Sequence, residues 1–166
     1  TFRPCFENVD LSLVKERSLL DEYREAGCRV EWFDQGCPST MPAVVPVAPE
    51  WDLLVWGQVG HYRQRVHAVE TALKAGYTVA WAGTGPYPAG VVQLPWTAPE
   101  ELPKLASRAR CVLSCGVRNE IAGYWSDSLW LALGMGACVI RKQTPGLPDG
   151  PYFTYHEDSE VVSRLR

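Results

Sequence analysis

The chain has 166 residues, of which 46% are hydrophobic and 21% charged, and its formal net charge is −3. This length and apolar content suffice for one domain with a sizeable core, with room for a piece of a neighbouring domain. The net charge argues against a large nucleic-acid surface, and no apolar run is long enough to cross a bilayer. The six cysteines form no C-x-x-C pair, which favours free thiols in a cytoplasmic protein over disulfides or a metal site.

The first elements predicted along the chain are a helix over Leu11–Ala26 and a strand over Cys28–Phe33. A proline-rich stretch follows at residues 38–50, and because proline fixes the backbone and lacks an amide donor, we interpret this stretch as an extended connector. The sequence thus divides into a helix–strand segment over residues 1–37, the connector, and a main domain over residues 51–166.

From residue 51 onward, apolar strands alternate with helices. Strands are predicted over residues 51–56, 77–82, 91–94, 111–115, 137–140 and 152–155. Helices are predicted over residues 62–75 and 99–109, between Ser126 and Gly134, and from residue 159 to the end. Helices between buried strands predict βαβ units, and therefore an α/β fold with a Rossmann-like parallel sheet and helices on both faces. Ligands of such sheets bind at the carboxyl ends of the strands.

The loop after the strand at residues 51–56 contains two glycines, Gly57 and Gly60, followed by basic side chains. Glycines allow the backbone to approach a phosphate closely, and Arg63 or Arg65 would neutralise its charge. His61 is the histidine best placed to act as a general base, because it lies beside this turn. The alternative is a tight turn next to a solvated arginine face.

Three more loops belong to the same edge of the predicted sheet. The loop after the strand at 77–82 would bring the backbone or an aromatic ring near a base; its candidate residues are Gly83, Thr84 and Tyr87. The loop at residues 116–120 ends in Glu120, a carboxylate suited to acid–base work or hydroxyl contacts. The loop after the strand at 137–140 begins with two cations, Arg141 and Lys142.

The stretch from Gly123 to Ile140 has the pattern of a turn, a capped helix, a glycine stop and a buried strand. Ser126 or Asp127 would cap the helix by accepting from its first N–H groups. The N-terminus of such a helix favours anions, because its N–H groups and its dipole both attract negative charge. The alternative is an ordinary capped helix that binds no ligand.

On these segments the chain resembles the C-terminal, donor-binding domain of GT-B glycosyltransferases, and most closely the bacterial and phage group related to CgeB-like spore-coat proteins. Residues 34–38 resemble the bridge that leads from the N-terminal domain of such enzymes. The segments that carry the resemblance are 51–57 with Arg63, 76–83, 102–113, and 123–140 with Pro145, Gly146 and the strand at 152–155.

The resemblance implies a nucleotide-sugar donor, an unknown acceptor and no metal or other cofactor, because a helix dipole and basic side chains would stabilise the leaving diphosphate. The diphosphate would lie between the first glycine turn and the helix start, and the base near the loop after the strand at 77–82. The implied catalytic residues are His61 and Glu120. The implied donor-binding residues are Gly57, Gly60, Arg63, Gly83, Thr84, Tyr87, Tyr124, Ser126, Asp127 and Lys142.

The chain departs from this family in two respects. Relatives carry an arginine and a ribose-binding glutamate in the helix where this chain has Ser128 and Leu131. We also expect the acceptor-binding N-terminal domain to be missing or reduced, with residues 1–37 as a helix–strand segment and bridge from it. A competing interpretation is therefore a non-catalytic nucleotide- or partner-binding domain derived from a glycosyltransferase. A weaker one, a flavodoxin-like response-regulator domain, lacks the expected acidic cluster after the first strand.

Overall fold

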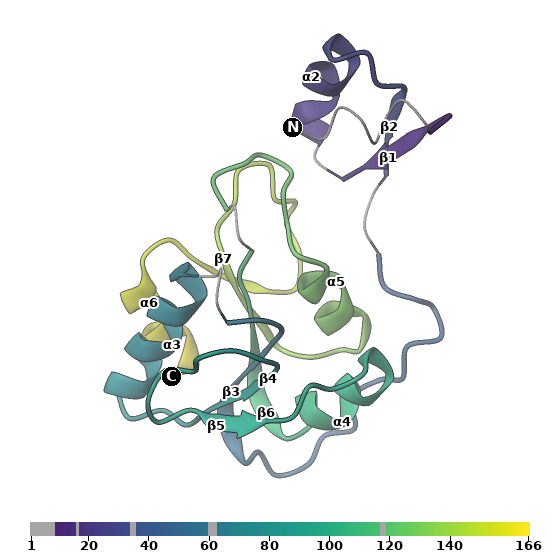
Figure 1. Cartoon of the computed structure of the whole chain (residues 1–166). Coiled ribbons are helices and arrows are strands. Elements are labelled where there is room, and N and C mark those ends of the chain that lie inside the picture. The colour runs from purple at the N-terminus through teal and green to yellow at the C-terminus, as the bar shows by residue number, and fades with distance from the viewer. Residues whose placement is uncertain (1–8, 16, 34–35, 60–62, 117–118) are drawn as a thin grey trace.

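The computed structural model describes residues 9–15, 17–33, 36–59, 63–116 and 119–166 (Figure 1). Within them, six parallel strands form one sheet in the order β5-β4-β3-β6-β7-β8. From β3 the chain steps outward to β4 and β5, and it then crosses back to build β6, β7 and β8 on the other side. This is the doubly wound strand order of Rossmann-like folds, so the fold predicted from the sequence is confirmed. The strands are β3 (Trp51–Trp56), β4 (Val79–Ala82), β5 (Val92–Leu94), β6 (Ala109–Ser114), β7 (Val139–Lys142) and β8 (Phe153–Tyr155).

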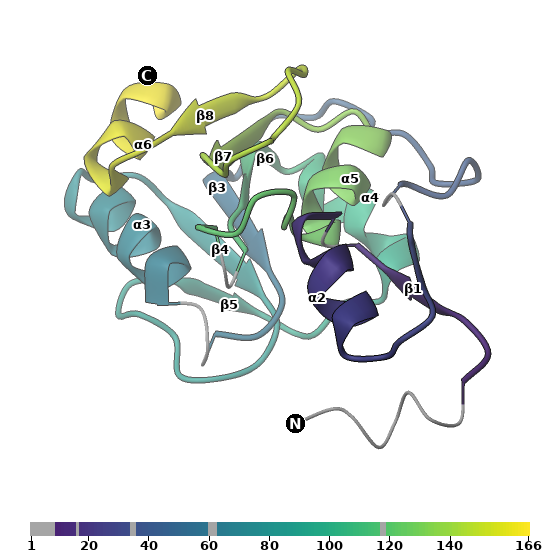
Figure 2. The same cartoon turned by 90° about the horizontal axis from the view of Figure 1, so that it is seen from above.

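Helices cover both faces of this sheet (Figure 2). The α3 helix (Arg63–Lys74) and α6 (Asp158–Leu165) pack on one face, and α4 (Leu102–Ala106) and α5 (Asp127–Gly134) pack on the other. Side chains of β3 alternate between the two cores: Leu53 and Val55 join the first, and Leu54 joins the second. Each such leucine or valine, removed from water, contributes about 1.5–3 kcal/mol to stability.

The N-terminal segment folds differently from the sequence prediction. Instead of a helix over Leu11–Ala26, it forms β1 (Ser12–Val14), a 3₁₀ turn at η1 (Arg17–Leu19) and a short helix, α2 (Leu20–Glu25). The prediction was wrong because β1 pairs in parallel with β2 (Val30–Trp32), a partner that lies beyond the helical pattern of the sequence. The three residues of β1 therefore form hydrogen bonds to β2 in a two-stranded sheet and not within a helix.

The connector, residues 38–50, has no helix or strand. It nevertheless lies against the main domain, because the N–H of Val44 donates to the carbonyl of Met135 at 2.7 Å. Cys37 occupies space that a side chain at position 134 would need: a Cβ on Gly134 would stand 2.1 Å from its Sγ. The division of the chain at residues 37 and 50 stays a prediction.

Other elements also differ from the sequence prediction in their bounds. The helix expected over residues 99–109 is a 3₁₀ turn, η2 (Pro99–Glu101), followed by the five residues of α4, and the next strand already begins at Ala109. Within the described residues, no helix combines the length and the apolar character needed to cross a membrane.

Candidate functional site

The carboxyl ends of β3 and β6 form the switch point of the sheet, because the chain leaves these two neighbours in opposite directions. Loops that diverge in this way open a crevice, and Rossmann-like folds place their ligands there. The described loop residues at this point are Gly57–Val59 after β3 and residues 115, 116 and 119 after β6.

Arg65 connects the two central strands at the switch point. Its side chain is buried, and its guanidinium donates to the carbonyl of Trp56 at 3.1 Å and to that of Cys115 at 2.6 Å. Of the two arginines considered as phosphate ligands, Arg65 is therefore engaged by strand-end carbonyls. Arg63, the first residue of α3, is exposed at the same end of the sheet.

Two glycines allow the ends of β3 and β4 to touch. A Cβ on Gly83 would stand 2.1 Å from the carbonyl oxygen of Gly57, a distance that no side chain tolerates. Gly57 has φ +99, and its carbonyl accepts from the indole N–H of Trp81 at 2.9 Å. The backbones of Gly57 and Gly83 therefore approach each other with no Cβ between them.

The loop after β4 packs against the end of β3. The carbonyl of Thr84 accepts from the N–H of Val59 at 3.0 Å, while the side chain of Thr84 is exposed. Tyr87 donates its hydroxyl to the carbonyl of Gly83, and its ring packs edge-to-face on Trp81 with 6.0 Å between centroids. The structure thus brings Gly57, Gly83, Thr84 and Tyr87 together.

The start of α5 is capped by Ser126, one of the two caps that the sequence predicted. The hydroxyl oxygen of Ser126 accepts from the N–H of Ser128 at 3.3 Å and from its hydroxyl at 2.9 Å. The hydroxyl of Ser128 also lies 3.0 Å from that of Ser114, which is buried at the end of β6. A chain of three hydroxyls therefore fixes the helix start to the sheet, and Asp127 remains exposed on the first turn.

The N-terminal segment lies against this helix start. Nζ of Lys15 is 4.0 Å from Oδ1 of Asp127 and 5.0 Å from the ring centroid of Tyr124. Ser18 donates its hydroxyl to the carbonyl of Ala122 at 2.7 Å. Sequence reasoning missed Lys15, because more than a hundred residues separate it from the helix that it approaches.

Asn119 holds the loop after β6. Its buried side chain accepts from the N–H of Gly116 at 3.0 Å and donates to Oε1 of Gln64 at 2.6 Å. Glu120 follows it and is exposed. The predicted residues Gly60 and His61 lie outside the described residues. The assignment of His61 and Glu120 as catalytic residues stays a prediction.

The two cations after the strand at 137–140 are placed differently from the expectation. Lys142 ends β7 and turns toward α6: its Nζ donates to the carbonyl of His156 and lies 3.8 Å from Oδ1 of Asp158. Arg141 is not in a loop but within β7, where it is fully buried. Burial lowers the pKa of Arg141 to about 10, because the charged guanidinium is removed from water.

The described residues contain no group of three or more histidine, cysteine, aspartate or glutamate side chains that could hold a metal ion.

Comparisons with known proteins identify the fold. No protein-family model matches the sequence, and no curated protein does. Among solved structures, the chain is similar to the crystal structure of AviGT4, a glycosyltransferase involved in avilamycin A biosynthesis, with a TM-score of 0.56 and 16% identity. The similarity covers 92% of this chain and 52% of AviGT4, so the chain spans about half the length of that protein. The feature that the two share is the Rossmann-like α/β fold.

Proposed function

We propose that this chain is the donor-binding part of a GT-B glycosyltransferase, which transfers a sugar from a nucleotide-sugar to an acceptor. The observation that carries the proposal is the doubly wound sheet whose switch point has the closely approaching backbones of Gly57 and Gly83 on the β3 side and a serine-capped helix start beyond β6. The likeness to a glycosyltransferase structure supports it. We also propose, from the resemblance in sequence, that the chain corresponds to the C-terminal domain of a CgeB-like enzyme.

In this proposal the diphosphate lies between the turn after β3 and the start of α5. Arg63 contributes positive charge from one side, and the N-terminus of α5 attracts the anion from the other. The base of the nucleotide lies near the loop of Thr84 and Tyr87. Lys142 is engaged with α6, and would have to leave Asp158 to contact the donor.

The proposed reaction is a substitution at the anomeric carbon of the donor sugar. An acceptor hydroxyl oxygen forms the new bond to this carbon, the bond from the carbon to the diphosphate oxygen breaks, and the nucleoside diphosphate leaves with the electron pair. The hydroxyl proton passes to a base, for which His61 and Glu120 are the candidates. Arg63 and the N–H groups of α5 stabilise the charge that develops on the leaving diphosphate.

The alternative function is a domain that keeps the fold but has lost the donor. Its support is that Ser128 is buried and bonded to Ser114, and that Leu131 is half-buried against the α4–α5 core. Neither position offers the polar contacts that relatives have there. This alternative predicts no binding of nucleoside diphosphates or their sugars.

Calorimetric titration with UDP, GDP, ADP, TDP and their sugars separates the two functions. We expect one of these compounds to bind at micromolar affinity, and the absence of binding by every compound of the panel would refute the proposal. Arg63→Ala should weaken that binding by about ten- to a hundredfold, since a charge-assisted hydrogen bond is worth about 1.5–3 kcal/mol. Lys74→Ala is the matched control, because it removes an exposed cation from the opposite end of the same helix.

A second variant tests the helix start. Replacing Ser126 and Asp127 by alanine together should lower stability by about 1 kcal/mol through the lost cap. If α5 holds the diphosphate, affinity should fall at temperatures well below the unfolding transition, where loss of the cap alone leaves the protein folded. Equal affinity in the variant and the parent would remove the α5 start from the donor site.

A further inference from the structure

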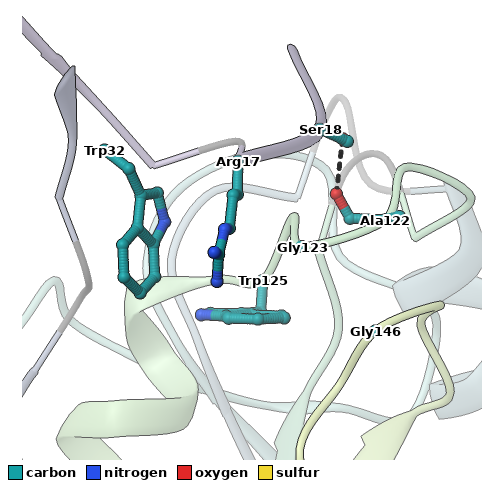
Figure 3. A pocket seen from close by; sticks show the side chains of 7 residues that line it. All are labelled: Arg17, Ser18, Trp32, Ala122, Gly123, Trp125 and Gly146. Atoms are coloured by element: carbon teal, nitrogen blue, oxygen red, sulfur yellow. Dashed lines mark hydrogen bonds between the residues drawn. The ribbon is translucent and has the colours of Figure 1, made fainter. Parts of the chain in front are cut away.

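A cavity of about 340 Å³ lies between the N-terminal segment and the loops around α5 and β7. Its walls are the side chains of Arg17, Trp32 and Trp125, and its floor is formed at Ala122, Gly123 and Gly146 (Figure 3). A volume of this size is at the lower end of the range of small-molecule sites, and fits a compound of one ring with its substituents.

Aromatic rings and one cation define the walls. The guanidinium carbon of Arg17, at the start of η1, lies 5.1 Å from the ring centroid of Trp32, the last residue of β2. Figure 3 shows Arg17 extending from the N-terminal segment toward the indole of Trp125. Trp125 is itself held by Trp130 of α5, edge-to-face at 6.2 Å between centroids.

Two glycines in left-handed conformations, which have no side chains to fill the cavity, form part of the floor. Gly123 has φ +75 and Gly146 has φ +72, and a Cβ on Gly146 would lie 3.5 Å from the nitrogen of Gly123. The hydrogen bond between the Ser18 hydroxyl and the Ala122 carbonyl fastens the upper wall to this floor. The cavity is therefore built by two segments that are distant in sequence and joined directly.

The lining has a defined chemistry. Among the described residues around the cavity, Arg17 is the one charged side chain, and no carboxylate accompanies it. A guanidinium recognises carboxylate and phosphate groups through paired N–H donors. Indole faces bind flat or C–H-bearing rings. Together they favour a ring compound that carries an anionic group.

We propose that this cavity is the acceptor site and that its acceptor is a hydroxylated ring compound bearing a carboxylate or a phosphate. The inference rests on the proposed glycosyltransferase function, because Trp125 directly precedes Ser126, the cap of the helix where the diphosphate is placed. An acceptor held by Arg17 against Trp32 and Trp125 presents its hydroxyl beside the donor, and transfer then follows the bond changes given above.

Quenching of tryptophan fluorescence in the whole chain provides the test, with glucuronate, glucose 6-phosphate and 4-hydroxybenzoate as probes and neutral glucose as the comparison. At least one anionic probe should bind, and glucose should bind at least tenfold more weakly. The three probes distinguish a sugar acid, a sugar phosphate and an aromatic acid as the source of the anionic ring.

Arg17→Gln should weaken binding of that probe at least tenfold, as should Trp32→Leu, which removes a wall that is 39% exposed and so tolerates replacement. Arg24→Gln, on the exposed face of α2, is the matched control and should bind as the parent does. Failure of every anionic probe to bind, or equal affinity in Arg17→Gln and the parent, overturns the proposal.

Comparing the probe measurements with the donor titration keeps the two proposals apart. Binding of a nucleoside diphosphate without any anionic probe refutes the acceptor site and leaves the proposed function intact. Binding of an anionic probe without any nucleoside diphosphate supports the cavity as a binding site, and refutes both the glycosyltransferase function and the acceptor role that depends on it.

Discussion

Replacing the buried arginine of β7 should stabilise the protein. Arg141 is fully buried, and within the described residues its guanidinium makes one hydrogen bond, from Nη2 to Oγ1 of Thr144 at 3.0 Å. Its Nε and Nη1 have no hydrogen-bond partner within the described residues. Removing one such charge in favour of an apolar side chain of similar length, as in Arg141→Met, relieves the cost of burial without leaving a charged partner behind.

The size of the effect follows from the pKa of the guanidinium. Burial lowers the pKa of Arg141 to about 10, against an ordinary value of about 12.5, which corresponds to a cost of about 3 kcal/mol for the charged form. The lost hydrogen bond to Thr144 offsets about 1 kcal/mol, and looser packing offsets part of the remainder. Arg141→Met should therefore gain about 1–2 kcal/mol at pH 7, and raise the melting temperature by about 2 to 8 °C.

Urea unfolding at pH 7 and at pH 10.5 measures this effect. Arg141 keeps its proton up to a higher pH in the unfolded chain than in the folded one. The stability of the parent therefore rises between about pH 10 and 12.5, and the stability advantage of Arg141→Met over the parent is smaller at pH 10.5 than at pH 7. Arg110→Met, an exposed arginine on β6, is the control and should change stability by less than 1 kcal/mol. A loss of more than about 1 kcal/mol in Arg141→Met at pH 7 would refute the reasoning.

Three further variants test the packing and the thiols. Gly83→Ala should cost about 3 kcal/mol or more in urea unfolding, because its Cβ would overlap the carbonyl of Gly57, and an unchanged midpoint would contradict that contact. Leu131→Glu should lower the melting temperature, because it buries part of a carboxylate against the α4–α5 core. An unchanged melting temperature together with tighter nucleotide binding would show instead that this position faces the donor. Cys138 should be alkylated by iodoacetamide with a midpoint near pH 7, because the thiol of Cys111, 3.4 Å away, donates to its sulfur and lowers the pKa of Cys138 to about 7. Cys111→Ala should move this midpoint to higher pH, and an unchanged midpoint would exclude the hydrogen bond between the two thiols.

Sequence reasoning succeeded where the pattern is local and both faces of an element are buried. The strand at Trp51–Trp56 has the predicted bounds, because a parallel strand covered on both sides is largely apolar, as in the buried run Leu53–Val55, and the turn at Gly57 ends it. The cap at Ser126 was also predictable, since its signal lies within three residues of the helix start. The helix over Leu11–Ala26 failed because the pairing of β1 with β2 is not local.

The candidate site was less predictable, because the directions of the arginine side chains do not follow from their positions in the sequence. A sequence shows that a cation follows a strand, but not whether its side chain turns outward to a ligand or inward to carbonyl groups. Arg63 and Arg65 are two positions apart, and the first is exposed while the second is buried. Lys15 and Arg17 were missed because the fold alone brings the N-terminal segment to α5.

Arg65 also affects how salt would influence an anion at this edge. The carboxyl edge of a parallel sheet presents carbonyl oxygens, whose partial negative charge repels phosphates. Arg65 donates to the carbonyls of Trp56, Gln58 and Cys115, and places a full positive charge beneath the switch point. Mobile ions screen a buried charge much less than an exposed one. Attraction of an anion by Arg65 should therefore persist at ionic strengths that weaken the contribution of Arg63.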